Sequence, residues 1–376
     1  MKLFKQASVF APKELGVKDV LIAGGKIIEV ADDLSQFEHD GVEVIDAKGK
    51  ILTPGFVDSL VHITGGGGEG GYGTRTPEMT INEAIEGGVT TVIGVLGTDS
   101  ITRSLENLLA KSYALEEQGI SVYSYTGSYH LPAVTVTGSI TKDIMLIDKF
   151  IGIGEVAIAD HRGSQLTVQE LAKAASEARV GGMLSNKVGI VSVHVGDGES
   201  GVSLLHQVAE QTDIPLSQFY PTHINRSQAL LEQGIKLAKA GGVIDFTTST
   251  NEQILASGEV KAAQALAIAL EQGVPVSQLT MSSDGNASLP VFDEAGNLTD
   301  LQIGEVKSLH QAMVEAVQCF NVPLSDALTS ISLSPANILK LKNKGQIKPG
   351  LDADINLLCA ETLTIEAVYA KGKQLA

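Results

Sequence analysis

Residues 54–62 read Pro54-Gly55-Phe56-Val57-Asp58-Ser59-Leu60-Val61-His62, and Gly65-Gly66-Gly67-Gly68-Glu69 follows almost at once. The apolar run is typical of a buried strand, and the glycines allow a sharp turn and a close approach of backbone to ligand. Polar loops at the C-terminal ends of strands hold the active sites of parallel α/β barrels. The stretch therefore predicts one wall of an active site, with His62 at the strand exit.

Strand-like and helix-like segments alternate through the middle of the chain, which predicts right-handed βαβ units and a parallel sheet. The strand candidates are residues 55–63, 90–98, 121–130, 151–159, 189–196, 219–225, 243–249 and 279–284. Helical patterns between them include residues 101–118, 167–180, 227–240 and 251–272. Eight such units over about 270 residues match a TIM-like (β/α)8 barrel in number and length.

Both ends of the chain are richer in short strands than the middle. Two apolar runs, residues 19–23 and 26–30, flank Gly24-Gly25 and form a hairpin signal. Similar runs return past residue 340. We predict that residues 1–53 and 340–376 together form a small β-sandwich domain, and that residues 54–339 form the barrel.

Composition narrows the possible partners and the compartment. The net charge of −17 argues against nucleic acid or an anionic membrane as partner, because both need a basic face. Cys319 and Cys359 lie in apolar contexts without paired spacing, so we expect two buried thiols in a reducing compartment. With no signal-peptide pattern and no apolar run of about 18 residues, a cytoplasmic protein is expected.

Residues with reactive side chains recur at the predicted strand ends. In chain order they are His62, Tyr129 and His130, Glu155 with Asp160-His161-Arg162, His194, His223 with Arg226, and Asp284. Glu155 fits this pattern less well, because it lies inside its apolar run. A single strand histidine is more often a core residue, but imidazoles and carboxylates converging on one barrel mouth suit Zn²⁺ or a similar ion. Such an ion with an open coordination position lowers the pKa of bound water to about 7.

Several longer motifs resemble those of a known enzyme family. Besides the glycine loop, they are Thr74-Arg75-Thr76-Pro77-Glu78, Thr126-Gly127-Ser128-Tyr129-His130, Asp160-His161-Arg162, Pro221-Thr222-His223-Ile224-Asn225-Arg226 and Ser282-Ser283-Asp284-Gly285-Asn286. They resemble the bacterial isoaspartyl dipeptidases, zinc-dependent β-aspartyl peptidases of the amidohydrolase superfamily. The resemblance runs through nearly the whole chain.

The resemblance implies roles in metal binding and catalysis. His194 and His223 would bind one metal ion, at the β metal site, and His62 and Asp284 a second, at the α metal site. Asp284 would also be the general base that takes a proton from the metal-activated water. Tyr129 would polarise the scissile carbonyl and stabilise the oxyanion.

The resemblance also implies how substrate is held. Glu69 would bind the substrate α-amino group, and Arg162 and Arg226 its carboxylates. Thr98 and Ser288 would add hydrogen bonds. The set is chemically complementary, because a β-aspartyl dipeptide carries two carboxylates and one ammonium group.

Two positions depart from the family pattern. Leu60 stands where the first-strand motif has a metal-binding histidine, and Glu155 stands where the family has a carboxylated lysine that bridges two metals. A glutamate can still bridge, but leucine cannot coordinate. Glu155, His194 and His223 supply the three protein ligands of a catalytic mononuclear zinc site. The hypothesis is one tightly held ion at the β metal site and a weak or empty α metal site.

The sequence thus predicts metal-dependent hydrolysis of the isopeptide bond of β-aspartyl dipeptides. Two alternatives stay open: another amidohydrolase activity, on an N-acyl amino acid or a cyclic amide, and a catalytically silent homologue that binds acidic peptides. Glu69 and the two arginines favour the dipeptide, whereas Leu60 favours the silent homologue. By analogy with such barrel enzymes, a homo-oligomer is expected.

Overall fold

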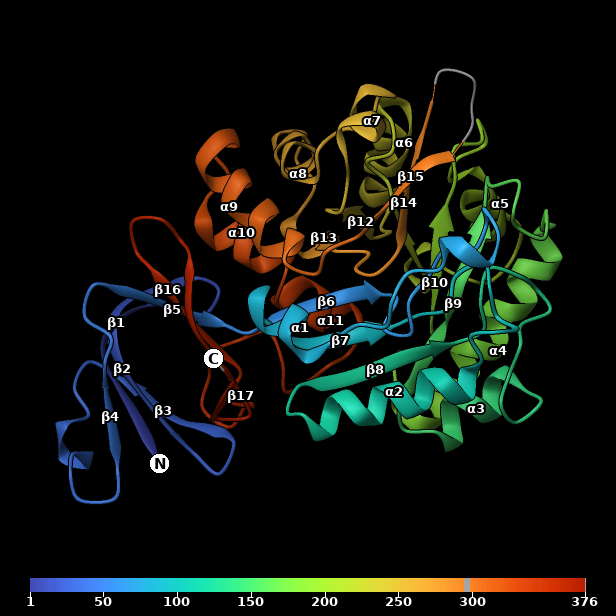
Figure 1. Cartoon of the computed structure of the whole chain (residues 1–376). Helices are drawn as coiled ribbons and strands as arrows, with labels where there is room; N and C mark the ends of the chain where they lie inside the picture. The colour runs from blue at the N-terminus through green and yellow to red at the C-terminus, as the bar shows by residue number, and fades with distance from the viewer. Residues whose placement is uncertain (294–297, 376) are drawn as a thin grey trace.

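Parallel strands form the centre of the larger part of the molecule (Figure 1). The computed structural model describes residues 1–293 and 298–375. A six-stranded parallel sheet has the order β11-β10-β9-β8-β7-β6, and β12 pairs with β13. The strands are β6 (Phe56–Val61), β7 (Val89–Gly94), β8 (Ser121–Thr126), β9 (Phe150–Ile158), β10 (Ile190–Val195), β11 (Phe219–Thr222), β12 (Ile244–Thr247) and β13 (Leu279–Ser282). Each lies within, or within one residue of, a predicted strand.

Backbone hydrogen bonds at the strand ends join the two sheets into a barrel. On one side, Ile224 N–H donates to the Asp245 carbonyl at 3.2 Å, which connects the end of β11 to β12. On the other, Asp284 N–H donates to the Leu60 carbonyl at 3.1 Å, next to the end of β6. The predicted (β/α)8 architecture is confirmed.

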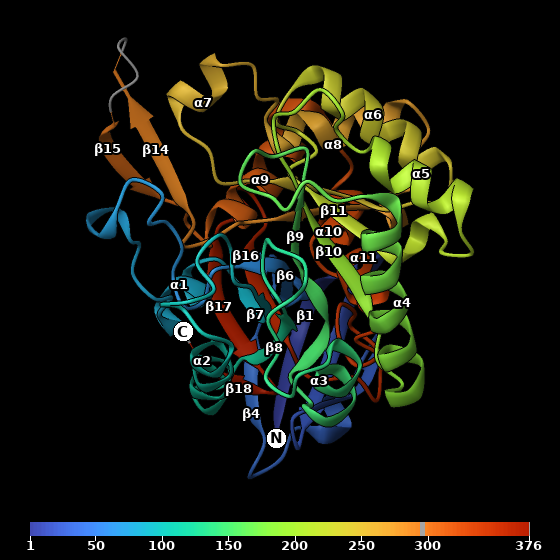
Figure 2. The ribbon, with the colours of Figure 1, turned by 90° about the vertical axis from the view of Figure 1, so that its right-hand side faces the viewer.

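Helices cover the outside of the barrel (Figure 2). They are α1 (Ile81–Glu86), α2 (Leu105–Glu117), α3 (Ile140–Leu146), α4 (Val168–Ser185), α5 (Ser203–Gln211), α6 (Gln228–Lys239), α7 (Glu252–Ala256), α8 (Ala262–Glu271), α9 (Ser308–Phe320), α10 (Leu324–Ser330) and α11 (Leu333–Ile338). Short 3₁₀ helices are η1 (Ser35–Phe37), η2 (Tyr72–Thr74), η3 (Leu216–Gln218) and η4 (Val276–Gln278).

The helices expected at 101–118, 167–180 and 227–240 correspond to α2, α4 and α6. The single helix predicted over residues 251–272 is wrong, because the structure has α7 and α8 there. Between them Gly258 has φ +110°, which no right-handed helix accommodates.

The two ends of the chain meet in one sheet (blue and red in Figure 1). Its strands are β1 (Lys2–Phe10), β2 (Glu14–Ala23), β3 (Lys26–Ala31), β4 (Glu43–Asp46), β5 (Lys50–Pro54), β16 (Ile355–Cys359), β17 (Ile365–Ala370) and β18 (Lys373–Gln374). The order is β18-β17-β16-β5-β1-β2-β3, with β4 on β1, and the predicted hairpin is β2–β3. Phe4 packs edge-on against Tyr369, which links the two ends in one core. The small terminal β domain is confirmed, while its boundaries at 53 and 340 stay a prediction.

A hairpin follows the last barrel strand. It consists of β14 (Ser288–Phe292) and β15 (Leu298–Ile303) and stands at the edge of the molecule in Figure 2. Ser288, Leu289, Pro290, Leu298 and Leu301 from this hairpin line a large cavity at the barrel mouth. The hairpin therefore extends one wall of that cavity beyond the barrel.

Cysteine placement and membrane spans were also predicted from sequence. Both cysteines are free, but Cys319 is exposed and Cys359 only half-buried, so the prediction of two buried thiols is wrong. For Cys319 the reason is that the buried stripe of α9 ends at Ala316. Within residues 1–293 and 298–375, no helix combines the length and apolarity needed to cross a membrane.

Candidate active site at the barrel mouth

A cavity of about 1520 Å³ opens where the barrel strands end. Most of the residues predicted for the site line it: His62, Glu69, Thr98, Tyr129, Arg162, His194, His223, Arg226, Asp284 and Ser288. Glu155 lies beneath them and is fully buried. His161 reaches the rim with its side chain 87% exposed, and His130 is exposed next to Ser164. The structure thus brings the predicted set together and leaves these last two histidines at the periphery.

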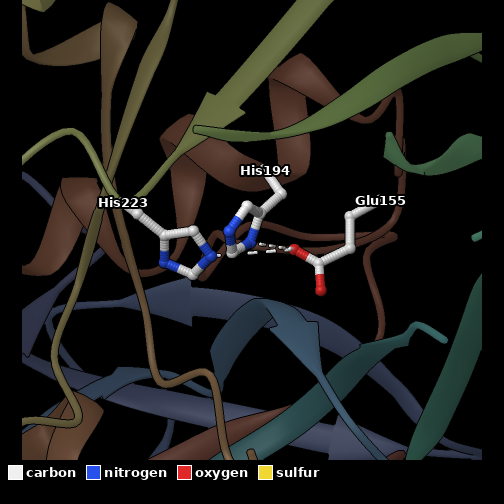
Figure 3. Close-up of side chains that lie close together, drawn as sticks. All are labelled: Glu155, His194 and His223. Carbon is white, nitrogen blue, oxygen red and sulfur yellow. Dashed lines mark ion pairs between the residues drawn. The ribbon is translucent and has the colours of Figure 1, made fainter. Parts of the chain in front are cut away.

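Three buried side chains converge at the floor of the cavity (Figure 3). One ligand atom from each of Glu155, His194 and His223 lies within 4.8 Å of the others. Glu155 Oε2 is 3.4 Å from His194 Nδ1 and 3.7 Å from His223 Nε2. The distances between these ligand atoms suit one metal ion held between the three side chains.

A β-bulge explains why Glu155 reaches the site from inside its strand. Between two paired positions, β9 spans residues 153–156 while β10 spans only 191–193. The extra residue changes the direction of the side chains in the bulged strand, as bulges near active sites commonly do. Gly154 is required here, because its φ is +153° and an added Cβ would lie 2.6 Å from the Ser192 Cβ. The glycines before Glu155 are the only sequence signal of this bulge.

Two predicted metal ligands have unusual backbone conformations. His223 and Asp284 follow β11 and β13 with φ of 63° and 52°, in the left-handed region. Such residues cost about 1–3 kcal/mol each and concentrate at functional sites. His223 is also fixed by its other nitrogen, because Nδ1 lies 2.5 Å from Thr247 Oγ1. That contact turns Nε2 toward Glu155.

His62 lies on the opposite side of Glu155. Its Nε2 is 3.4 Å from Glu155 Oε1 and 3.2 Å from Asp284 Oδ1. Leu60, two residues earlier, packs in an apolar cluster inside the barrel with Val57 and Ile93 and is 2% exposed. This side of the site therefore has one imidazole and two carboxylates, with a hydrocarbon where the family motif has a second imidazole.

Unsatisfied oxygen atoms test whether these residues suit a metal ion. Among the described residues, both carboxylate oxygens of Glu155 and Oδ1 of Asp284 are buried without a hydrogen-bond partner. Buried polar atoms without partners are rare in folded proteins, and a bound cation is one explanation. Two imidazoles and a carboxylate are a ligand set of catalytic zinc sites. The residues present therefore fit a divalent ion.

Charge states at the site also suit a cation. Burial by itself raises the pKa of Glu155, but the imidazoles of His194, His223 and His62 outweigh burial and hold that pKa well below its ordinary value. Burial opposes ionisation of Asp284 too, but His62 and then His223 lower its pKa. Both carboxylates are therefore ionised at neutral pH.

The histidines on the two sides titrate in opposite directions. Burial, followed by the charges of Arg226 and His194, lowers the pKa of His223 to about 4. It is therefore neutral, as a metal ligand must be. For His62, Asp284 and Glu155 overcome the effect of burial and raise the pKa to about 10. In the metal-free chain His62 is therefore the cation that balances the two acids.

Tyr129 lies over the floor of the cavity with a phenol group that stays protonated. Its hydroxyl is 2.8 Å from His194 Nδ1, and burial followed by the charge of Glu155 raises its pKa well above the ordinary value. The guanidinium carbon of Arg162 lies 5.4 Å from the ring centroid, in cation–π range. Tyr129 can therefore donate an O–H hydrogen bond to a ligand beside the metal ligands.

Charged groups of both signs line the wall above the floor. Glu69 Oε1 accepts hydrogen bonds from Thr98 Oγ1 at 2.7 Å and from Arg162 Nη1 at 3.3 Å. Arg226 Nη1 lies 3.4 Å from Asp197 Oδ1, and its Nε is buried without a partner in the described chain. The wall can therefore pair with an ammonium group and with carboxylates.

The glycine loop is held by a residue that sequence reasoning missed. Gly65 has φ +78°, and a Cβ there would lie 2.4 Å from the Thr76 carbonyl oxygen. Buried Arg103 donates from Nη2 to the carbonyls of Gly66 and Thr76, at 3.0 and 2.8 Å. Arg103 lies outside every motif and its contacts are long-range, so no local signal identifies it.

The fold and this site define a metal-dependent hydrolase. The chain belongs to the amidohydrolase family, to which residues 51–375 match.

Solved structures narrow the similarity further. The β-aspartyl dipeptidase of Fervidobacterium islandicum AW-1, crystallised with the β-Asp-Leu dipeptide, is 46% identical with a TM-score of 0.93, covering 100% of this chain and 95% of that one. Another structure of a β-aspartyl dipeptidase from the same organism is 44% identical with a TM-score of 0.90, covering 100% and 96%. A curated relative, the dihydroorotase of Elusimicrobium minutum, is 25% identical across 98% of this chain and 90% of its own length.

Proposed function

We propose that this chain is a zinc-dependent β-aspartyl dipeptidase that hydrolyses the isopeptide bond of β-aspartyl dipeptides. The observation that carries the proposal is one cavity in which a metal-ligand group faces Glu69, Arg162 and Arg226. The similarity to the β-aspartyl dipeptidase crystallised with β-Asp-Leu supports the same substrate class.

Glu155, His194 and His223 would hold the ion at the β metal site. When bound, a divalent ion lowers the pKa of a coordinated water to about 7 and polarises a carbonyl group. His62 and Asp284 would form a weaker α metal site, because Leu60 has no ligand atom to add. We infer one tightly bound zinc ion per chain.

Two residues would move or hold protons during hydrolysis. Asp284, ionised and directed to the cavity floor, takes a proton from the attacking water at its carboxylate and passes it to the leaving amine. Tyr129 donates its phenolic proton in a hydrogen bond to the carbonyl oxygen, where negative charge develops. The raised pKa of Tyr129 suits this role, since the hydroxyl keeps its proton.

The wall residues would orient the dipeptide by its three charges. Glu69 binds the α-ammonium group, and Arg162 and Arg226 bind the carboxylates, with further hydrogen bonds from Thr98 and Ser288. In the free chain Glu69 contacts Arg162 and Thr98. When substrate binds, the contact between Glu69 and Arg162 would be replaced. Glu69 would pair with the substrate ammonium group and Arg162 with a substrate carboxylate, so each side chain would keep a partner of opposite charge.

Assembly and location complete the proposal. A homo-oligomer is inferred by analogy with barrel enzymes of this kind. A cytoplasmic location is inferred from the two unpaired cysteines, since reducing compartments keep thiols free.

Hydrolysis of β-Asp-Leu by purified protein tests the proposal. The protein is treated with a chelator, then assayed with and without added Zn²⁺, and α-Asp-Leu serves as the matched peptide control. We expect zinc-dependent cleavage of β-Asp-Leu alone. Dihydroorotate is assayed in parallel because curated relatives are dihydroorotases. Turnover of dihydroorotate without cleavage of β-Asp-Leu would overturn the proposal.

A further inference from the structure

Asp160 lies between a metal ligand and a substrate-binding arginine, although it belongs to neither group. It follows β9, and its side chain is only 5% exposed. Its Oδ2 is 3.0 Å from His194 Nε2 and 2.7 Å from Arg162 Nη2. Its Oδ1 accepts from Arg162 Nε at 3.0 Å. One buried carboxylate therefore contacts both functional side chains.

The contact with His194 selects which ring nitrogen faces the metal site. A carboxylate at Nε2 favours the tautomer with the proton on Nε2, which leaves the lone pair on Nδ1. Nδ1 is the atom near Glu155, at 3.4 Å, and near the Tyr129 hydroxyl, at 2.8 Å. Asp160 therefore turns the unprotonated nitrogen toward the other ligands.

The contact with Arg162 selects which edge of the guanidinium faces substrate. Nε and Nη2 both donate to Asp160, so that edge is occupied. Nη1 points the other way and reaches Glu69 at 3.3 Å on the cavity wall. The fork geometry of arginine means that fixing one edge fixes the direction of the remaining donors.

We propose that Asp160 is a positioning residue that sets the metal affinity of His194 and the orientation of Arg162 together. The part that concerns Arg162 rests on the proposed function, whereas the part that concerns His194 requires only that the β metal site binds metal. Asp160 acts through these two side chains and does not itself contact the reacting atoms.

A purely local role is the competing explanation. Oδ1 of Asp160 also accepts from Arg162 N–H at 2.8 Å, and its carbonyl accepts from Gly163 N–H at 3.0 Å, as in an ordinary turn. A residue that only shapes this turn would change stability and leave metal affinity alone. Metal affinity therefore separates the two explanations.

The test compares Asp160→Asn with Asp99→Asn as matched control. Asp99 also lines the cavity and pairs with an arginine, Arg75, at 3.0 Å, and it accepts backbone hydrogen bonds within its turn. Both variants remove one negative charge, but Asp99 hydrogen-bonds to Arg75 and its own loop rather than to a metal ligand.

Zn²⁺ binding to the metal-free proteins is measured by competition with a chromophoric chelator. We expect Asp160→Asn to raise the Zn²⁺ dissociation constant about 10–100-fold, the effect usual for a partner of a ligating histidine. Asp99→Asn should match the wild type. A dissociation constant for Asp160→Asn within twofold of wild type would overturn the inference. At saturating Zn²⁺, Asp160→Asn should also raise KM for β-Asp-Leu more than it lowers kcat.

Two controls keep the result interpretable. Thermal unfolding of the metal-free variants checks that they fold. Should Asp160→Asn fail to fold, the Co²⁺-loaded wild type supplies the test by proton NMR. We expect the His194 Nε2 proton to exchange slowly with water, and exchange as fast as in free imidazole would overturn the inference. If Asp160→Asn loses Zn²⁺ affinity but the wild type does not cleave β-Asp-Leu, the proposed function is rejected and the inference about His194 stands.

Discussion

The two sides of the cavity floor are built differently. On the side of β9, β10 and β11, Glu155, His194 and His223 converge, with neutral His223 fixed by Thr247. On the side of β6 and β13, His62 faces Asp284 and Glu155, and Leu60 packs into the apolar interior. The first side resembles a preformed metal site and the second a buried ion pair. The comparison teaches that three side chains can keep a converging, metal-like geometry although the neighbouring side lacks one imidazole of the family motif.

The largest effect is expected from His223→Ala. This change removes one of three ligands at the β metal site, so we expect loss of tight metal binding and a fall in kcat/KM well beyond the 10–100-fold typical of residues that only support a ligand. Chelator competition and β-Asp-Leu kinetics measure both. His62→Ala is the matched variant on the other side and should keep tight binding. Equal loss of metal in the two variants would remove the distinction between the sides.

Asp284→Asn should lower kcat by roughly 10²–10⁴-fold, as expected for removal of a general acid–base group. Tight metal binding should persist, because Asp284 lies outside the β metal site. Steady-state kinetics and metal content are measured on the same preparation. A variant with full turnover would show that another group carries the proton.

Leu60→His restores the imidazole of the family motif and is expected to raise the metal content from one ion to two per chain. Leu60 packs in the barrel interior, so a polar ring there should also cost about 1–3 kcal/mol of unfolding free energy in the metal-free protein. Elemental analysis and denaturant unfolding report the two effects. A variant that still holds one ion would mean that factors other than Leu60 weaken the α metal site.

A smaller effect is expected from pH on the metal-free protein. The pKa of His62 is raised to about 10 in the folded chain, above its ordinary value of about 6.5, so its proton stabilises the fold below pH 6.5. That contribution is lost as pH rises toward 10, on the order of a few kcal/mol. Urea unfolding at a series of pH values measures it, with His62→Gln as control. Identical pH profiles for wild type and variant would contradict the ion-pair account.

Much of the fold and the site could be predicted from local patterns. Alternating strand and helix signals placed all eight barrel strands. Polar residues at the strand ends, together with the family resemblance, identified ten of the residues that line the cavity. The failures have physical reasons. The bulge in β9 that directs Glu155 into the site from inside its strand was not predicted, because a bulge carries little sequence signal. The break at Gly258 was missed because the flanking residues are good helix formers.

Residues that act through distant partners could not be identified at all. Arg103 supports a loop nearly forty positions away, and Thr247 fixes His223 from the next strand. Asp160 stands within a recognised motif, but its contact with His194 depends on how β9 and β10 are paired. Such roles follow from tertiary contacts, which one sequence does not specify.

The most direct test of the central claim is the metal content of active protein. Wild-type chain is loaded with excess Zn²⁺, freed of loosely bound ions by gel filtration, and analysed for zinc per chain alongside hydrolysis of β-Asp-Leu. The account predicts one zinc ion per chain with full activity. Two tightly held ions, with activity that follows the second, would contradict it.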